Sequence, residues 1–157
     1  DQTRIGMYGH SRGGMMTYMC MARANWIKAA VVGAAKADEV NAHLYRKNWK
    51  DNQKKMYGGS EKEKIKRSAI MWPEKMCKTT PLLICHGTAD WRVNPQESLI
   101  LSQKLLALKH PVRTIMYEGA DHGISEFGNE YIGEAIKWFD RFVKNHETLP
   151  NMELHGR

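Results

Sequence analysis

Residues 4–20, RIGMYGHSRGGMMTYMC, decide the fold of this sequence. Residues 4–8 form a short apolar run that predicts a strand, and residues 11–24 carry the spacing of a helix. Three apolar residues recur along this helix and are expected to pack in the core: Met15, Met19 and Ala22. Between strand and helix, residues 9–13 match G-x-S-x-G, the nucleophile elbow, which places Ser11 on a sharp turn.

The elbow explains why a serine stands among glycines. A strand that turns abruptly into a helix leaves no room for side chains, so we expect a Cβ at Gly9 or Gly13 to collide with backbone. The hydroxyl of Ser11 then projects freely. The N–H of Arg12 lies at the start of the helix, where it can stabilise a developing oxyanion. A serine is a weak nucleophile without a base, however, so the rest of the chain must supply one.

Strands and helices alternate along the remaining sequence. Further apolar runs predict strands over residues 27–32, 81–85 and 112–117, and periodic stretches predict helices over residues 95–109 and 129–145. This alternation is typical of βαβ units, and hence of an α/β fold with a parallel sheet and helices on both faces. Active sites of such sheets lie at the carboxyl ends of the strands.

The two later helices carry signals of their own. Asn94 is an N-cap candidate, and Glu97 stands where it would nearly complete a capping box. In the last helix, four apolar residues are expected to line the buried side: Ile132, Ile136, Phe139 and Val143.

Two residues that could activate Ser11 each follow a predicted strand. His122 comes after residues 112–117 and can act as a base, and Asp90 comes after residues 81–85 and can orient that histidine. The order Ser, Asp, His is that of α/β-hydrolases. Two other acids, Asp121 and Glu118, stand near the histidine but are less suited to orient it. The remaining histidines are expected to be solvated: His10, His43, His86, His110, His146 and His155.

Composition excludes several other classes of protein. The net charge of +7 arises mostly from residues 45–67, where acidic residues are interspersed, so we expect a solvated helical face rather than a nucleic-acid site. No apolar run reaches the roughly 18 residues of a membrane span. No signal-peptide pattern is present either. Three cysteines without a CxxC pair predict neither disulfides nor zinc, which is typical of a reducing compartment such as the cytoplasm.

Residues 36–72 form a charged, partly helical insertion that could be a lid. Its aromatic residues could cover the site, or could form the apolar side of ordinary helices: Tyr45, Trp49 and Tyr57. Arg12, Trp91 and Arg92 flank the candidate nucleophile and acid, and either arginine could bind a substrate carboxylate. Alternatively, Arg92 forms a structural ion pair and Trp91 packs under the loop. Residues 148–157 are expected to be a flexible tail after a domain over residues 1–147.

Three segments, GHSRGG, TPLLICHGTADWRVNPQES and GADHG, resemble the catalytic domain of the prolyl oligopeptidase (S9) family of serine peptidases. The resemblance implies that Ser11 is the nucleophile, Asp90 the orienting acid and His122 the general base, with no metal or organic cofactor. Catalytic domains of this family have eight strands. The chain would then be the C-terminal half of an α/β-hydrolase fold, strands five to eight. The first four strands, with the loop that carries the second oxyanion donor, would precede Asp1.

The expected function is hydrolysis of a small peptide or an ester through an acyl-enzyme. A peptidase is the first reading, a carboxylesterase with the same triad is the second, and a truncated or non-catalytic hydrolase-like module is the third. No nucleic acid or membrane partner is expected. The exposed edge of the first strand would allow pairing with a second copy of the chain.

Overall fold

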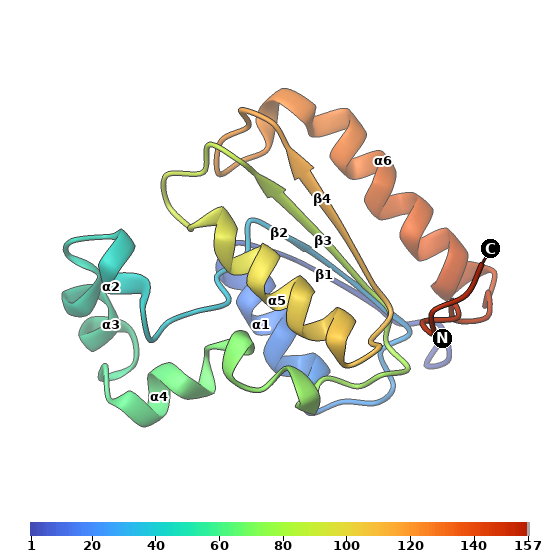
Figure 1. Cartoon of the computed structure of the whole chain (residues 1–157), viewed down its shortest axis with the longest axis horizontal. Helices are drawn as coiled ribbons and strands as arrows, with labels where there is room; N and C mark the ends of the chain where they lie inside the picture. Colours follow the sequence, from blue (N-terminus) through green and yellow to red (C-terminus); the bar gives the residue numbers. More distant parts are fainter. Residues whose placement is uncertain (157) are drawn as a thin grey trace.

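A computed structural model describes residues 1–156 and shows one parallel sheet in the strand order β1-β2-β3-β4. The strands are β1 Gly6–His10, β2 Ala29–Gly33, β3 Leu82–Gly87 and β4 Val112–Tyr117 (Figure 1). In the register of the sheet His10 lies beside Gly33, Gly33 beside Cys85 and Gly87 beside Tyr117, so the carboxyl ends of all strands meet at one end of the sheet. The predicted α/β class with a parallel sheet is confirmed.

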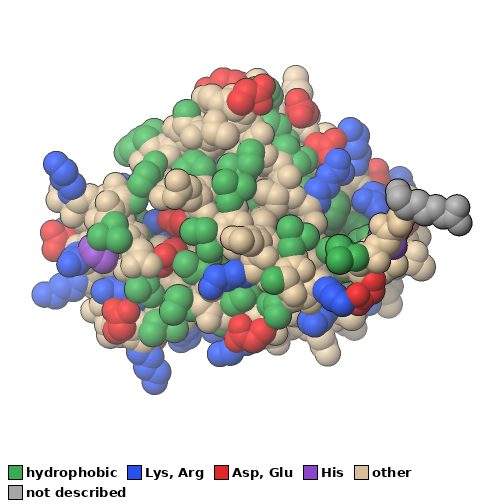
Figure 2. Space-filling model, viewed as in Figure 1, with side chains coloured by type: hydrophobic (Ala, Val, Ile, Leu, Met, Phe, Trp, Pro, Cys, Tyr) green, Lys and Arg blue, Asp and Glu red, His purple; other side chains and the backbone are tan. Residues whose placement is uncertain are grey.

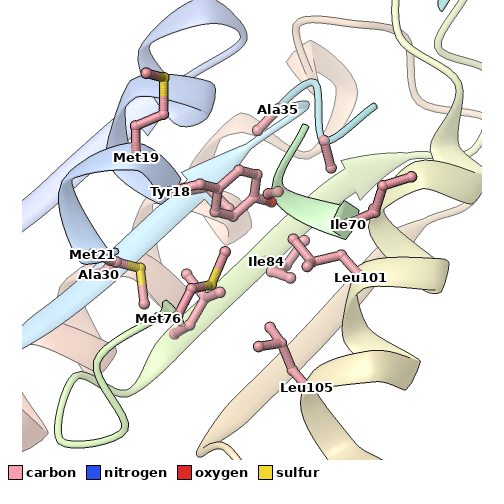
Figure 3. Close-up of a cluster of buried hydrophobic side chains, with 14 of the residues drawn as sticks. Tyr18, Met19, Met21, Ala30, Ala35, Ile70, Met76, Ile84, Leu101 and Leu105 are labelled. Carbon is pink, nitrogen blue, oxygen red and sulfur yellow. The ribbon is translucent and has the colours of Figure 1, made fainter. Parts of the chain in front are cut away.

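Helices cover both faces of this sheet (Figure 1). Helices α1 Arg12–Met21 and α5 Pro95–Ala107 lie on one face, and α6 Gly128–Phe139 lies on the other. Figure 3 shows the core under α1 and α5, which includes Tyr18, Ile84 and Leu101. Every residue of β2 and of β3 is buried, as expected for strands that are covered on both faces.

Strand β1 starts later than the sequence predicts and runs two residues further. Residues 1–4 form a turn instead, in which the Asp1 carboxylate accepts hydrogen bonds from Thr3 and Arg4. Strand β3 likewise continues to Gly87. As a result, β1 ends directly before Ser11 and β3 ends three residues before Asp90.

The buried side of α6 differs from the predicted stripe. Ile132 and Ile136 are 49% and 56% exposed, so the prediction is wrong at these two positions. The buried positions that face the sheet are Tyr131, Ala135, Trp138 and, in the π-helical turn Asp140–Lys144 that follows α6, Phe142. Phe139 and Val143 are partly buried beside this core, as predicted.

The segment between β2 and β3 holds three short helices, α2 Ala42–Tyr45, α3 Trp49–Tyr57 and α4 Glu61–Lys66, and two 3₁₀ turns, η1 Ala69–Met71 and η2 Pro73–Lys75. The helices lie beyond the sheet, and Figure 2 shows Lys and Arg side chains projecting there with acidic ones among them. Gly58 ends α3 in the left-handed conformation, with a φ of 82°.

Residues 148–156 form neither helix nor strand, and Arg157, the last residue of the predicted tail, lies outside the described residues. Over residues 1–156, none of the helices has the length and apolar character that a membrane crossing requires.

Candidate active site

Ser11 lies between β1 and α1 in a strained conformation, with φ 55° and ψ −115°. A positive φ is rare for a residue with a side chain, and such strain clusters at functional sites. The turn is held by the N–H of Ser11, which donates to the carbonyl of Gly33 at 2.7 Å. The backbone N–H of Arg12, the first residue of α1, has no acceptor within the helix and is available to a ligand.

Neighbouring atoms leave no room for a side chain at two glycines of the turn, Gly9 and Gly14, whereas the motif predicts Gly9 and Gly13. A Cβ on Gly9 would lie 2.3 Å from the carbonyl oxygen of Gly13, as expected. A Cβ on Gly13 would meet nothing within 4 Å, so the predicted collision there is wrong. The tight position is Gly14, whose Cβ would lie 2.4 Å from the Cβ of Ala35 after β2.

The structure brings Ser11, His122 and Asp90 together from three separate strand ends. His122 Nε2 lies 2.8 Å from Ser11 Oγ, and His122 Nδ1 lies 2.7 Å from Asp90 Oδ2. With the imidazole proton on Nδ1, His122 donates to Asp90 and accepts from the Ser11 hydroxyl. Asp121, the neighbouring acid, turns to its own backbone and accepts from the N–H of Gly123.

Asp90 is buried and receives four hydrogen bonds. Its Oδ1 accepts from the N–H groups of Arg92 and Val93, at 2.7 and 3.0 Å, and its Oδ2 accepts from His122 and from His86 Nε2. Burial raises the pKa of Asp90, but the two histidines and the two backbone N–H groups outweigh it and hold the pKa well below its usual range. Asp90 is therefore a carboxylate at neutral pH.

His86 is a site residue that the sequence reasoning missed. Instead of being solvated it is fully buried on β3, and it donates from Nε2 to Asp90 Oδ2 at 3.0 Å. Its Nδ1 accepts from the hydroxyl of Ser98 on α5 at 2.7 Å, which fixes this tautomer. Its position in the sequence could have indicated burial, because His86 directly continues the apolar run of residues 81–85 and precedes Asp90 by four residues.

His10 is also misassigned as solvated. It is partly buried and donates from Nε2 to the carbonyl of His122 at 2.9 Å, with the two rings in an edge-to-face arrangement. Burial and the neighbouring His122 lower the pKa of His10, so the ring is neutral around pH 7. The contact fixes the loop that carries His122. His110 is buried too, near the carbonyl of Cys77, whereas His146 and His155 are exposed as expected.

A cavity of about 870 Å³ opens beside Ser11 and His122. Its wall is formed by the start of α1, by the segment between β2 and β3, and by Arg92. Of the predicted substrate contacts, Arg12 and Arg92 line this cavity. Trp91 is 62% exposed, and its ring lies under the guanidinium of Arg92, 4.9 Å from the centroid.

Helices α2 and α3 stand against the site. Trp49 and Tyr57 line the cavity, and the Tyr45 hydroxyl donates to the carbonyl of Asp90 at 2.6 Å. Buried Glu39 holds α3 in place, because its Oε2 accepts from Trp49 Nε1, Gln53 Nε2 and the Tyr57 hydroxyl at 2.7 to 2.9 Å. The insertion thus forms one wall of the cavity.

Glu97 does not close the predicted capping box, although Asn94 caps α5 by accepting from the N–H of Gln96. Instead Glu97 Oε2 accepts from the N–H groups of Ala37 and Asp38, at 2.8 and 2.7 Å. The carboxylate therefore ties α5 to the chain that leaves β2. Burial raises the pKa of Glu97, and the neighbouring Lys36 opposes that rise.

Within residues 1–156, His, Cys, Asp and Glu form no group of three or more that could hold a metal ion. The expectation that the chain uses no cofactor stays a prediction.

The parallel sheet and the serine on a strained strand-to-helix turn define the class of α/β-hydrolases. The sequence model of the prolyl oligopeptidase family matches residues 1–146, and the chain belongs to this family. It is similar to an uncharacterized peptidase, YtmA, of Bacillus subtilis, with 29% identity over 90% of this chain and 55% of YtmA. It is also similar to dipeptidyl peptidase 4 of Sus scrofa, with 27% identity over 96% of this chain and 19% of that protein.

Among solved structures, an acylaminoacyl peptidase of Pyrococcus horikoshii superposes with a TM-score of 0.82 at 21% identity, which supports the fold. The match covers 97% of this chain and 26% of that one. The chain thus spans about half the length of YtmA, and a smaller share of the other two proteins.

Proposed function

We propose that this chain is the catalytic part of a serine peptidase that cleaves a peptide bond through an acyl-enzyme. The observation that carries the proposal is the hydrogen-bonded line from Ser11 Oγ through His122 to Asp90, at the carboxyl ends of three parallel strands. Membership in the prolyl oligopeptidase family supports the peptide bond as the target.

In this mechanism Ser11 Oγ attacks the carbonyl carbon of the scissile bond while His122 Nε2 takes its proton. The oxyanion that forms accepts a hydrogen bond from the free N–H of Arg12, at the positive end of α1. His122 then gives the proton to the leaving amine as the C–N bond breaks. Water, deprotonated by His122, attacks the resulting ester and releases the acid, and the proton returns to Ser11.

Asp90 keeps the imidazole of His122 in the tautomer that leaves Nε2 free to accept, and stabilises the imidazolium that forms. His86 is a positioning residue, because it reaches the substrate only through Asp90. With four donors on two oxygens, the carboxylate has a single favourable orientation, and that orientation points at His122.

The direct test is labelling of the purified chain with a fluorophosphonate probe, which reacts with activated serines. We expect the wild-type chain to be labelled and Ser11→Ala not to be labelled, while its melting temperature shows that it is folded. Ser125→Ala, which removes an exposed hydroxyl close in sequence to His122, is the matched control and should be labelled normally. Asp90→Asn should react about 10⁴-fold more slowly, because the imidazole loses its orienting carboxylate.

Two outcomes would contradict the proposal. Labelled protein that hydrolyses p-nitrophenyl esters but no peptide anilide would be a carboxylesterase with the same triad. A folded chain that is never labelled would be a non-catalytic hydrolase-like module.

A further inference from the structure

The wall of the cavity beside Ser11 has one predominant sign of charge. Five basic side chains line it: Arg12, Lys36, Arg46, Arg67 and Arg92. Glu39 is the one acidic side chain among the lining residues of the described chain, and its Oε2 already accepts three hydrogen bonds from α3. A cleft lined by one sign of charge concentrates the field inside it, and this cleft attracts anions.

Lys36 is the most buried of these five cations. It is only 5% exposed, and within residues 1–156 its Nζ has no hydrogen-bond partner. Glu97 Oε1 lies 3.8 Å away and offsets part of the charge, while Glu97 Oε2 is occupied by two backbone N–H groups. The ammonium also lies 4.7 Å from the centre of the Trp49 ring. A buried ammonium with three unused donors is costly unless a ligand accepts from it.

Arg46 converges on the same aromatic ring. Its guanidinium lies 4.5 Å from the centre of the Trp49 ring and 5.9 Å from that of Trp91. Within the described residues, no carboxylate lies within 4 Å of the guanidinium of Arg46, Arg92 or Arg12. Arg67, by contrast, forms an ion pair with Glu63. The two indoles lie beside the Arg46 guanidinium, and its N–H groups remain available to an acceptor.

We propose that this cavity binds a carboxylate of the substrate, through Lys36 and Arg46, so that the enzyme prefers peptides that place a carboxylate there. The inference rests on the proposed function, because it assigns the substrate class of the same site. A carboxylate accepts two parallel hydrogen bonds from a guanidinium, and it supplies the missing acceptor for a neighbouring ammonium.

Two positions in a peptide could supply the carboxylate: an acidic side chain on the acyl half, or the C-terminus of the leaving half. Two matched substrate pairs separate them. The first pair carries Glu or Gln as the residue whose carbonyl is attacked, in otherwise identical anilides. The second pair is an internally quenched peptide with a free or an amidated C-terminus. We expect kcat/KM to be about tenfold higher for the anionic member of one pair, which corresponds to about 1.4 kcal/mol of transition-state binding. The preference should shrink in 0.5 M NaCl.

Lys36→Met and Arg46→Met test the residues themselves. Each should bring the anionic-to-neutral ratio of kcat/KM close to one, because the cation that holds the carboxylate is gone. Lys47→Met is the matched control, because Lys47 adjoins Arg46 but is exposed. It should keep the full preference. If Lys36→Met fails to fold, Arg46→Met and the salt dependence still decide the question.

The two proposals fail in different ways. Wild-type protein that is labelled by fluorophosphonate, yet hydrolyses both members of each pair equally, overturns the carboxylate site and leaves the peptidase intact. If the chain is never labelled, binding is read from the melting temperature with acetyl-Glu-amide against acetyl-Gln-amide, and with acetyl-Ala against acetyl-Ala-amide. A rise for a carboxylate-bearing member alone, absent in Lys36→Met, supports the site. Equal melting temperatures within both pairs overturn it.

Discussion

Gly13 and Gly14 follow Ser11 in the same short motif but have different surroundings. Gly13 faces open space, whereas Gly14 touches Ala35 at the start of the segment behind β2. The double glycine in the sequence does not distinguish them, because the neighbour that matters comes from a different strand. The motif therefore indicates that the turn contains glycines, but the contact with Ala35 that makes Gly14 necessary is visible only in the folded structure.

This difference predicts opposite effects of one methyl group. Gly14→Ala places its Cβ 2.4 Å from that of Ala35, so we expect α1 to shift and the free energy of unfolding to fall by about 1–3 kcal/mol. Gly13→Ala adds a good helix former in open space and should raise it by about 0.5–1 kcal/mol. Urea denaturation of both variants measures the two changes. Equal effects would mean that the close approach of α1 to Ala35 is absent in solution.

The residues of the candidate triad could be located from sequence because each follows a recognisable strand, and the strands of a parallel sheet end together. His86 and His10 could not. A lone histidine has the same appearance in a sequence whether it is solvated or buried, and burial depended on β3 and β1 running two residues further than their apolar runs indicate. His86 donates to Asp90, and His10 donates to the carbonyl of His122. The two histidines that the sequence did not reveal therefore hold the acid and the base of the candidate triad.

At the scale of elements, Glu39 determines where α3 lies. One buried carboxylate oxygen accepts from Trp49, Gln53 and Tyr57, and these three donors span the length of the helix. Helix α3 is polar and short, so it has little apolar surface of its own with which to pack. We infer that the wall of the cavity is held mainly by this polar contact.

Glu39→Ala should therefore detach α3. Trp49 Nε1 and the Tyr57 hydroxyl lose their acceptor, while Gln53 Nε2 keeps only the Glu39 backbone carbonyl. We therefore expect the free energy of unfolding to fall by about 2–3 kcal/mol in urea denaturation, and α3 to become sensitive to trypsin under native conditions. Glu39→Gln keeps an acceptor oxygen and should cost about 1 kcal/mol. Glu61→Ala, an exposed acid on α4, is the control and should change stability little. Native-like trypsin resistance of α3 in Glu39→Ala would contradict this role.

Helix α6 shows why some packing could not be predicted. Its sequence offers two adjacent apolar stripes, one with Ile132 and Ile136 and one with Tyr131, Ala135 and Trp138. Periodicity alone favours the aliphatic stripe. The sheet selects the other, because a Cβ on Gly33 would lie within 2.8 Å of the Tyr131 ring, so the aromatic side chain fits only against a glycine.

At the scale of the whole molecule, the class of the fold and the order of its strands could be predicted because each strand is a short apolar run between helices. The path of residues 36–72 could not, since it depends on buried polar contacts made by Glu39 and Glu97 that no periodicity reveals. In the described residues β1 pairs only with β2, so one side of β1 is an open edge.

Pairing of that edge with a second copy stays a prediction from the sequence. We expect the average mass of the isolated chain to rise with concentration in sedimentation velocity, because unpaired strand edges recruit further strands. Tyr8, 47% exposed on β1, offers a way to block it. Tyr8→Lys should keep the chain monomeric and Tyr8→Phe should not. A wild-type chain that stays monomeric at every concentration would refute the prediction.

Behind Asp90 a line of hydrogen bonds continues into the body of the protein. His86 accepts from Ser98, and the Ser102 hydroxyl donates to the carbonyl of Ser98 and lies 2.5 Å from the Thr114 hydroxyl on β4. The dipoles along this line are fixed by folding, before any substrate is present. When positive charge develops on His122, little of the surrounding protein has to reorient, and the reorganisation energy of the proton transfer is correspondingly small. The cost of orienting those groups is met once, when the chain folds, rather than at each turnover.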